Sequence, residues 1–185
     1  MIDLSAYRTG DYDPGPLWRR VLWYGVSAII FETRIPWPSA LKAGLLRLFG
    51  AEVGPDAVIK PDVKVKFPWK LRMGRRCWIG ERVWIDNVAE VALGDQVVLS
   101  QGAGVFTGNH DYTAPGFDPR PGPVTIGDGA WIAAKAIVCP GVSIGELAVL
   151  TAGSVATRSL EGGAVHSGHP ATRKRAREIR DTNPD

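Results

Sequence analysis

The sequence predicts a mainly β protein built around a parallel β-helix of about five coils. In its second half an aliphatic residue recurs every six positions, and a small or modest residue follows each one four places later. A period of six fits neither an α-helix nor a two-sided strand, but it fits a flat-sided coil whose aliphatic side chains point inward. Such short repeats are typical of solenoids, whose units bury their apolar faces only against one another. The aliphatic positions are Ile126, Ile132, Val138, Ile144 and Leu150, and the small ones are Ala130, Ala136, Val142, Ala148 and Ser154.

Composition and charge limit the possible functions. The 185 residues suffice for one domain with appendages, and 22 glycines and 14 prolines suit a coil that turns a corner every few residues. A net charge of only +3 gives no reason to expect a nucleic acid partner. Cys77 and Cys139 lie inside the repeat, and Cys77 takes a small-residue position, which predicts a buried free thiol and a reducing compartment. Because no signal peptide is recognisable, we expect a cytoplasmic location.

Residues 1–50 are predicted to form a helical cap. An apolar stretch over residues 17–31 favours one helix, broken by two prolines, and a second is expected over residues 39–49 with Ser39 as its N-cap. We expect the helices to cover the open end of the solenoid, where strand edges are unpaired, or a seam between subunits. The alternative is an interfacial helix on a membrane, because tryptophans and arginines accompany an apolar run too short to span a bilayer.

The solenoid itself is predicted over residues 51–158. The six-residue spacing recurs upstream in three blocks, and the register slips by two residues between them. Because three hexads make one triangular coil, the chain holds about five coils. The blocks are Val53, Ile59 and Val65; Met73, Ile79 and Ile85; and Leu93, Leu99 and Val105.

One long excursion interrupts the repeat, over residues 111–123. It is rich in Pro, Gly and Asp, and His110 stands where the chain leaves the coil. Long loops that leave a compact repeat are usually functional. We therefore expect this loop to carry function.

Several motifs resemble the hexapeptide-repeat acyltransferases. They are Gly-Asn-His-Asp-Tyr at 108–112, Ile-Gly-Asp-Gly-Ala-Trp-Ile-Ala at 126–133, Pro-Gly-Val-Ser-Ile-Gly at 140–145 and Ala-Gly-Ser-Val at 152–155. The chain resembles in particular the colanic acid biosynthesis O-acetyltransferases, relatives of the nodulation, maltose and galactoside acetyltransferases; segments 45–50, 67–71 and 84–87 also fit this subgroup. The resemblance implies a left-handed parallel β-helix, a homotrimer, and acetyl transfer from acetyl-CoA to a sugar hydroxyl in exopolysaccharide or surface glycan biosynthesis.

His110 is the predicted catalytic residue. Acyl transfer to an alcohol needs a base, a histidine is the natural base near neutral pH, and His110 matches the family's catalytic position. The alternative is a structural turn histidine. The resemblance implies an acceptor contact one coil below, at Asp86 or Asn87, although an Asp that only caps a corner fits too. Further residues expected to shape the acceptor pocket are Asp111, Tyr112 and Phe117.

The resemblance also implies that CoA lies along the outside of the C-terminal coils, between two subunits. By position this implicates Trp131, Ala133, Ala134, Ala152, Gly153, Thr157 and Arg158. Within the tail, residues 159–185, we expect a short helix whose Arg173 and Lys174 hold the CoA phosphates. A solvated helix face is the alternative for this basic run. His169 stands where relatives usually carry Asn.

Other classes share the fold. Zinc hydratases need three histidines that converge on one metal. Here His166 and His169 lie beyond the repeat and His110 stands alone, so no metal is expected. A non-catalytic scaffold would not need the His110 loop. Among enzymes, a small free sugar or an antibiotic is the alternative acceptor, and the N-terminal helices would suit lipid-linked sugars at the inner face of the cytoplasmic membrane.

Overall fold

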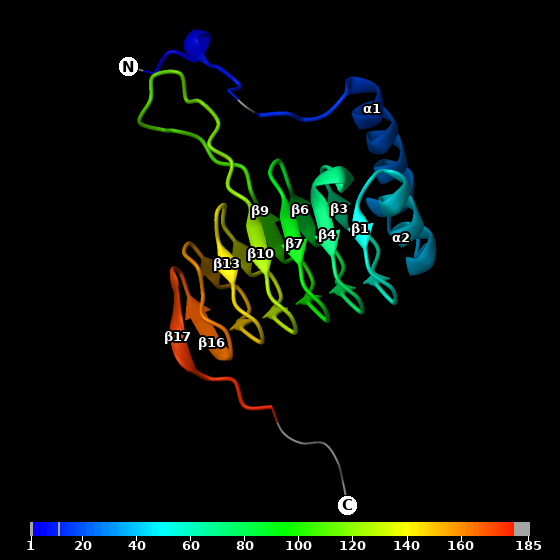
Figure 1. The fold of residues 1–185 in the computed structure, drawn as a ribbon, viewed down its shortest axis with the longest axis vertical. Coiled ribbons are helices and arrows are strands. Elements are labelled where there is room, and N and C mark those ends of the chain that lie inside the picture. Colours follow the sequence, from blue (N-terminus) through cyan, green and yellow to red (C-terminus); the bar gives the residue numbers. More distant parts are fainter. Residues whose placement is uncertain (1, 11, 180–185) are drawn as a thin grey trace, which may run out of the picture.

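The computed structural model describes residues 2–10 and 12–179, and its centre is a parallel β-solenoid with three flat sides (Figure 1). Sheet A has the strand order β1-β4-β7-β10-β13, sheet B β17-β16-β14-β11-β8-β5-β2, and sheet C β15-β12-β9-β6-β3. Successive strands therefore visit the three sheets in rotation as far as β15, which makes five complete turns in the described residues. The parallel solenoid predicted from the hexads is confirmed.

All of these strands are short. Sheet A comprises β1 (Glu52–Val53), β4 (Leu71–Met73), β7 (Val91–Leu93), β10 (Val124–Ile126) and β13 (Ser143–Ile144). Sheet B comprises β2 (Val58–Ile59), β5 (Trp78–Ile79), β8 (Val98–Leu99), β11 (Trp131–Ile132), β14 (Val149–Leu150), β16 (Ala164–Gly168) and β17 (Ala171–Ala176). Sheet C comprises β3 (Lys64–Val65), β6 (Trp84–Asp86), β9 (Gly104–Phe106), β12 (Ile137–Val138) and β15 (Val155–Ala156).

One corner of the solenoid is longer than the others. Ile126 pairs with Ile144, 18 residues on, but Val53 pairs with Met73, 20 residues on, because two residues are added to that turn. The additions all lie between a strand of sheet C and the next strand of sheet A. We call residues 66–70, 87–90 and 107–123 the long corner. The register slips seen in the sequence, and the excursion, are therefore three insertions at one edge.

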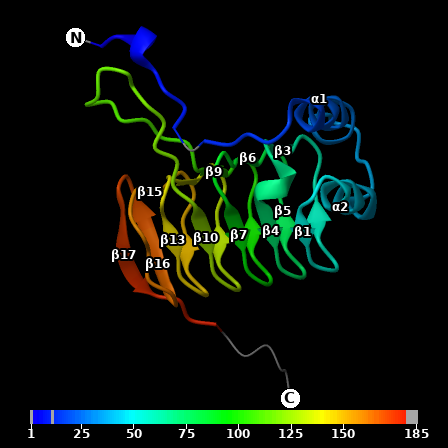
Figure 2. The same ribbon diagram turned by 45° about the horizontal axis from the view of Figure 1, so that its top comes forward.

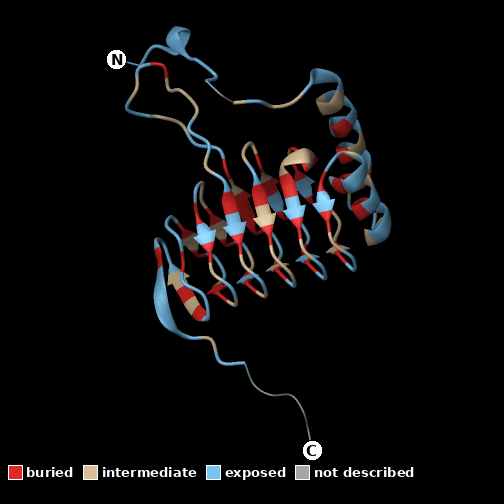
Figure 3. Ribbon diagram, viewed as in Figure 1, coloured by how far each residue is buried: buried red, intermediate tan, exposed pale blue. Residues whose placement is uncertain are grey.

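The core consists of the predicted aliphatic and small positions. All of them are buried, from Val53 at 9% exposed to Leu150 at 0%, and the solenoid strands carry buried residues next to exposed or intermediate ones (Figure 3). Cys77 is a buried free thiol, as predicted, and its Sγ donates to the Gly94 carbonyl at 3.1 Å. Burial raises the pKa of this thiol. The repeat thus encodes the interior directly.

Two helices cover the first coil. They are α1 (Leu17–Val26), continued by the π-helical η2 (Ser27–Phe31), and α2 (Ser39–Leu48) (Figures 1 and 2). Trp23 Nε1 donates to the Val65 carbonyl at 2.8 Å. Lys42 Nζ donates to the Lys60 carbonyl at 2.8 Å, and Arg47 Nε to the Val53 carbonyl at 2.9 Å. Side chains of the helices therefore hydrogen-bond edge carbonyls on all three sides. This agrees with the expectation that the helices cover the open end of the solenoid.

Two details differ from the expectation. Ser39 does not cap α2; its Oγ accepts from the Ile59 amide at 3.0 Å and so ties the helix to β2. The basic run near the C-terminus is no helix, because residues 164–176 form the antiparallel β16–β17 hairpin on sheet B. Residues 180–185 lie outside the described part.

The N-terminal segment also leaves the cap. Residues 2–10, with the short η1 (Leu4–Ala6), extend away from α1 and lie against the excursion loop (Figures 1 and 2). The Asp3 amide donates to the Pro115 carbonyl at 2.9 Å, and the Arg8 amide to Asp118 Oδ1 at 2.8 Å. None of the helices in residues 2–10 and 12–179 has the length and apolar character that crossing a membrane requires.

Candidate active site

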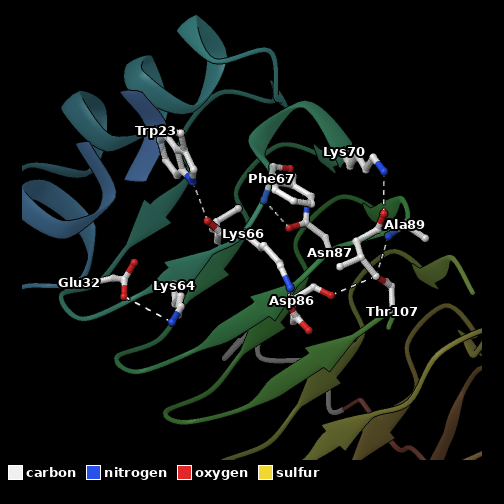
Figure 4. Close-up of polar contacts among 12 residues, drawn as sticks. Trp23, Glu32, Lys64, Lys66, Phe67, Lys70, Asp86, Asn87, Ala89 and Thr107 are labelled. Atoms are coloured by element: carbon white, nitrogen blue, oxygen red, sulfur yellow. Dashed lines mark hydrogen bonds and ion pairs between the residues drawn. The ribbon is translucent and has the colours of Figure 1, made fainter. Parts of the chain in front are cut away.

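The candidate site is built on the long corner, which a buried polar ladder holds in place (Figure 4). Asn87 accepts from the Phe67 amide at 2.9 Å and donates to its carbonyl at 2.6 Å. One turn on, Thr107 donates to the Asp86 carbonyl at 3.0 Å and accepts from the Ala89 amide at 2.8 Å. Both side chains are fully buried, and together they hydrogen-bond backbone groups of Phe67, Asp86 and Ala89 where the chain departs from the strands.

The excursion leaves this corner as a two-stranded stem. His110 forms an antiparallel bridge with Pro119, the Asp111 amide donates to the Asp118 carbonyl at 2.8 Å, and the Arg120 amide donates to the Asn109 carbonyl at 2.7 Å. His110 therefore lies on paired backbone rather than on an unpaired loop, and this pairing fixes the position of its Cα.

The His110 ring is oriented by Phe117. Its Nδ1 lies 3.0 Å from the Phe117 carbonyl oxygen, and the two rings are stacked with centroids 4.5 Å apart and planes 10° apart. A carbonyl only accepts, so the contact requires a proton on Nδ1, and in the neutral ring the lone pair is then on Nε2. Phe117 has φ +53°, a left-handed conformation that a Phe rarely adopts. The arrangement can supply a neutral imidazole base.

A cavity of about 320 Å³ lies beside His110, and Asp86 lines it from the turn below. Asp86 Oδ1 is 2.9 Å from Lys66 Nζ, one further turn down (Figure 4). Tyr7 and Tyr12 close the cavity from the N-terminal segment, and the Tyr7 ring centroid is 6.4 Å from that of His110. Burial raises the pKa of Tyr12. An imidazole, an ion pair and two phenols thus line one cavity.

Sequence reasoning missed Lys66, Tyr7 and Tyr12. Lys66 could have been found, because it lies 20 residues before Asp86 and the neighbouring pair Val65–Ile85 has that register. The two tyrosines had no such signal, since they reach the cavity only through the fold of the N-terminal segment.

The other predicted acceptor residues do not line this cavity. Asn87 is buried in the corner. Tyr112 is 77% exposed. Asp111 is used within the loop: its Oδ1 accepts from the Thr113 hydroxyl and amide at 2.6 and 3.0 Å, and its Oδ2 meets Arg120 at 2.6 Å. The Thr113 hydrogen bonds, with a smaller effect of the Arg120 guanidinium, lower the pKa of Asp111.

Most residues predicted for CoA lie on a different edge, between sheets B and C. Ala133 and Ala134 form the turn after β11, Ala152 and Gly153 form the turn after β14, and the Gly153 amide donates to the Ala134 carbonyl at 2.9 Å. Trp131 is 42% exposed and donates from Nε1 to Ser100 Oγ at 2.9 Å. The two turns are stacked. Gly153 has φ +67°, and no heavy atom lies within 4 Å of where its Cβ would be, so the outside of this turn is open.

The remaining predicted CoA residues lie at the C-terminal end. Arg158 and Arg173 line a cavity of about 440 Å³, where Arg173 forms an ion pair with Glu161. Thr157 and Lys174 are exposed nearby, Lys174 on β17. Val165 pairs with Arg175 and His166 pairs with Arg173, so Lys174 is the extra residue at an irregularity in the β16–β17 pairing.

The three histidines of the described residues lie in different parts of the fold, and His110 is on the stem of the excursion. His166 is buried on β16, with Nε2 3.0 Å from the Glu161 carbonyl, and His169 is exposed in the turn of the hairpin. In the described part of the chain, no group of three or more His, Cys, Asp or Glu side chains has an arrangement that could hold a metal ion.

Comparisons with known proteins agree with the fold. Residues 123–158 match the family model "Bacterial transferase hexapeptide (six repeats)". Over 172 residues the chain is 38% identical to the Escherichia coli (strain K12) protein named "Putative colanic acid biosynthesis acetyltransferase WcaF", covering 92% of this chain and 94% of that one. A solved Vibrio cholerae hexapeptide-repeat acetyltransferase with acetyl coenzyme A superposes with TM-score 0.80 at 20% identity, covering 95% and 97% of the two chains. A galactoside acetyltransferase with coenzyme A gives 0.75 at 22%, covering 91% and 88%.

Proposed function

The chain belongs to the hexapeptide-repeat acetyltransferases, and from this we propose that it moves an acetyl group from acetyl-CoA to a sugar hydroxyl with His110 as general base. The observation that carries the proposal is the His110 ring, whose Nδ1 faces the Phe117 carbonyl and which lines one cavity with Asp86. This leaves Nε2 free to accept a proton. The protein is a direct-transfer enzyme in this proposal, without a metal or an acyl-enzyme.

In the proposed reaction, Nε2 takes the proton of the acceptor hydroxyl as its oxygen attacks the thioester carbonyl carbon. The tetrahedral intermediate collapses by breaking the C–S bond, and the imidazolium returns the proton to the CoA thiolate. The products are the O-acetyl sugar and CoA. The Phe117 carbonyl stabilises the imidazolium by accepting from Nδ1–H throughout. Asp86, held by Lys66, would accept a hydrogen bond from an acceptor hydroxyl.

We further propose a surface glycan or exopolysaccharide precursor as the acceptor, because the Escherichia coli relative is named for colanic acid biosynthesis. The acceptor cavity and the stacked turns at Ala134 and Gly153 lie on different edges of the solenoid. A homotrimer would bring a neighbour's edge to the cavity and so unite donor and acceptor. The Arg158 and Arg173 cavity would then receive CoA phosphates.

The location proposed is the cytoplasm, with α1 in contact with the inner membrane face. Helix α1 presents apolar side chains to solvent: Leu17, Trp18, Val21 and Leu22 are 56–65% exposed. Such a face with tryptophan is typical of interfacial helices. An enzyme placed in this way could reach a lipid-linked acceptor.

The test is CoA thiol release from acetyl-CoA with a panel of sugars and lipid-linked sugar extracts. We expect His110→Ala to lower kcat/KM by about 10² to 10⁴, because positioned general-base catalysis contributes that much. His169→Ala, which removes an exposed histidine outside the cavity, serves as the control. Wild-type enzyme that binds CoA but acetylates nothing would contradict the acceptor class. Absence of CoA binding would favour a scaffold.

A further inference from the structure

A second cavity adjoins the acceptor cavity. It measures about 160 Å³, and the two share Lys66 and Asp86. Its other walls come from the helical cap and from sheet C: Tyr24, Ser27, Glu32, Lys64, Val65 and Trp84. We propose that this cavity is a second sugar subsite, so that the acceptor is a neutral oligosaccharide rather than a monosaccharide. The inference rests on the proposed function and specifies its substrate class.

The position of the second cavity fits a chain-like acceptor. Trp84 and Asp86 are alternate residues of β6, so both side chains point outward from sheet C. They lie about 7 Å apart along the strand. A ring whose hydroxyl reaches His110 beside Asp86 would therefore have its neighbour beside Trp84. The Lys66–Asp86 ion pair, drawn in Figure 4, lines both cavities.

Trp84 supplies an apolar wall. It is 43% exposed, and Phe106 packs edge-on against it with ring centroids 5.2 Å apart and planes at 77°. Phe106 can take this position because Gly104, opposite Trp84 in the next turn, has no side chain; a Cβ there would collide with the Phe106 ring. A braced, half-exposed indole suits the apolar C–H face of a pyranose ring.

The polar groups of this cavity favour a neutral ligand. Lys64 Nζ lies 3.7 Å from Glu32 Oε2, and Ser27 Oγ donates to Glu32 Oε1 at 2.9 Å. Both lysines of the second cavity therefore face a carboxylate, Lys64 with Glu32 and Lys66 with Asp86 (Figure 4). A phosphate site would need unpaired positive charge. Paired donors and acceptors instead match the hydroxyls of an uncharged sugar.

The experiment compares acceptors of different length in the acetyl transfer assay. The probes are methyl galactoside and methyl glucoside, di- and trisaccharides ending in the same sugars, and UDP-glucose. We expect wild type to prefer the longer neutral acceptors. Trp84→Ala should lower kcat/KM for these by roughly 3- to 10-fold while leaving the methyl glycosides within about 2-fold. Trp84→Phe should retain most of the preference.

Trp78→Ala is the matched control. Lys64 Nζ lies 5.2 Å from the Trp84 ring centroid, and Trp78 is matched to this: it is also 43% exposed and has Lys60 Nζ 4.9 Å from its ring centroid. Trp78 differs in lying on sheet B. An equal loss in both variants would overturn the subsite, and so would a preference for UDP-glucose over the neutral disaccharides.

The two proposals fail in different ways. Turnover of methyl glycosides without any gain from a second ring would overturn the subsite and leave the proposed function intact. If no sugar is acetylated, the proposed function fails, and calorimetric titration with the same trisaccharides then decides the subsite. Binding that Trp84→Ala weakens would support it, and absence of binding would overturn it.

Discussion

The side chains of the adjacent residues Asp86 and Asn87 point in different directions. The Asp86 side chain points out of β6 toward Lys66 and the acceptor cavity, whereas Asn87 points into the long corner and holds the Phe67 backbone. Family resemblance places an acceptor contact at one of the two. Alternation along the strand and the turn of the corner make Asp86 the one that faces solvent.

This difference makes a prediction. Asn87→Ala leaves the buried Phe67 amide and carbonyl without partners, so we expect the free energy of unfolding to fall by about 1–3 kcal/mol. Asp86→Asn should leave unfolding nearly unchanged and lower kcat/KM for the acceptor instead. Urea unfolding and the thiol-release assay, run on both variants, measure the two effects. Equal stability losses would contradict the assignment of roles.

At the scale of elements, the helical cap works through donors as much as through apolar packing. The first coil ends the solenoid, so its carbonyls would otherwise face no further strand. Lys42 is fully buried, yet its ammonium donates to the Lys60 carbonyl, and burial lowers the pKa of this lysine. Burying an ammonium group costs free energy, and here it is compensated by hydrogen bonding to a carbonyl at the open sheet edge.

We therefore expect Lys42→Met to destabilise the protein by about 1–3 kcal/mol, although Met fills the space and removes a buried charge, because the edge carbonyl loses its donor. Lys135→Met, at an exposed turn, should change stability little. Thermal unfolding of both variants is the measurement. A Lys42→Met protein as stable as wild type would show that apolar packing alone holds the cap.

At the scale of the whole molecule, the exposed face of α1 bears on where the enzyme works. We expect wild type to co-sediment with vesicles of anionic phospholipid and Leu22→Asp to lose most of that binding, because a charge there opposes burial of the apolar face. Leu48→Asp, at a 77% exposed residue of α2, is the control. Wild type that ignores vesicles would refute membrane contact. If Leu22→Asp instead changes the oligomeric state in analytical ultracentrifugation, the face is a subunit contact.

The sequence alone determined the solenoid, because each hexad states locally which side chain points inward and which corner must be small. It also determined where the excursion begins, because the six-residue spacing stops after His110 and resumes only beyond residue 123. Its weakest prediction was the C-terminal helix: a run of arginines and lysines has no apolar period, and pairing of β17 with β16 decided its conformation.

Only the tertiary structure decided the composition of the site. Tyr7 and Tyr12 line the same cavity as His110, although about a hundred residues of chain separate them from it. Tyr24, on the helical cap, lines the second cavity together with Trp84. No spacing in the sequence encodes such contacts, because they depend on how unrepeated segments pack against the solenoid. A regular repeat specifies its own interior, whereas its outer surface is specified by whatever segments fold back onto it.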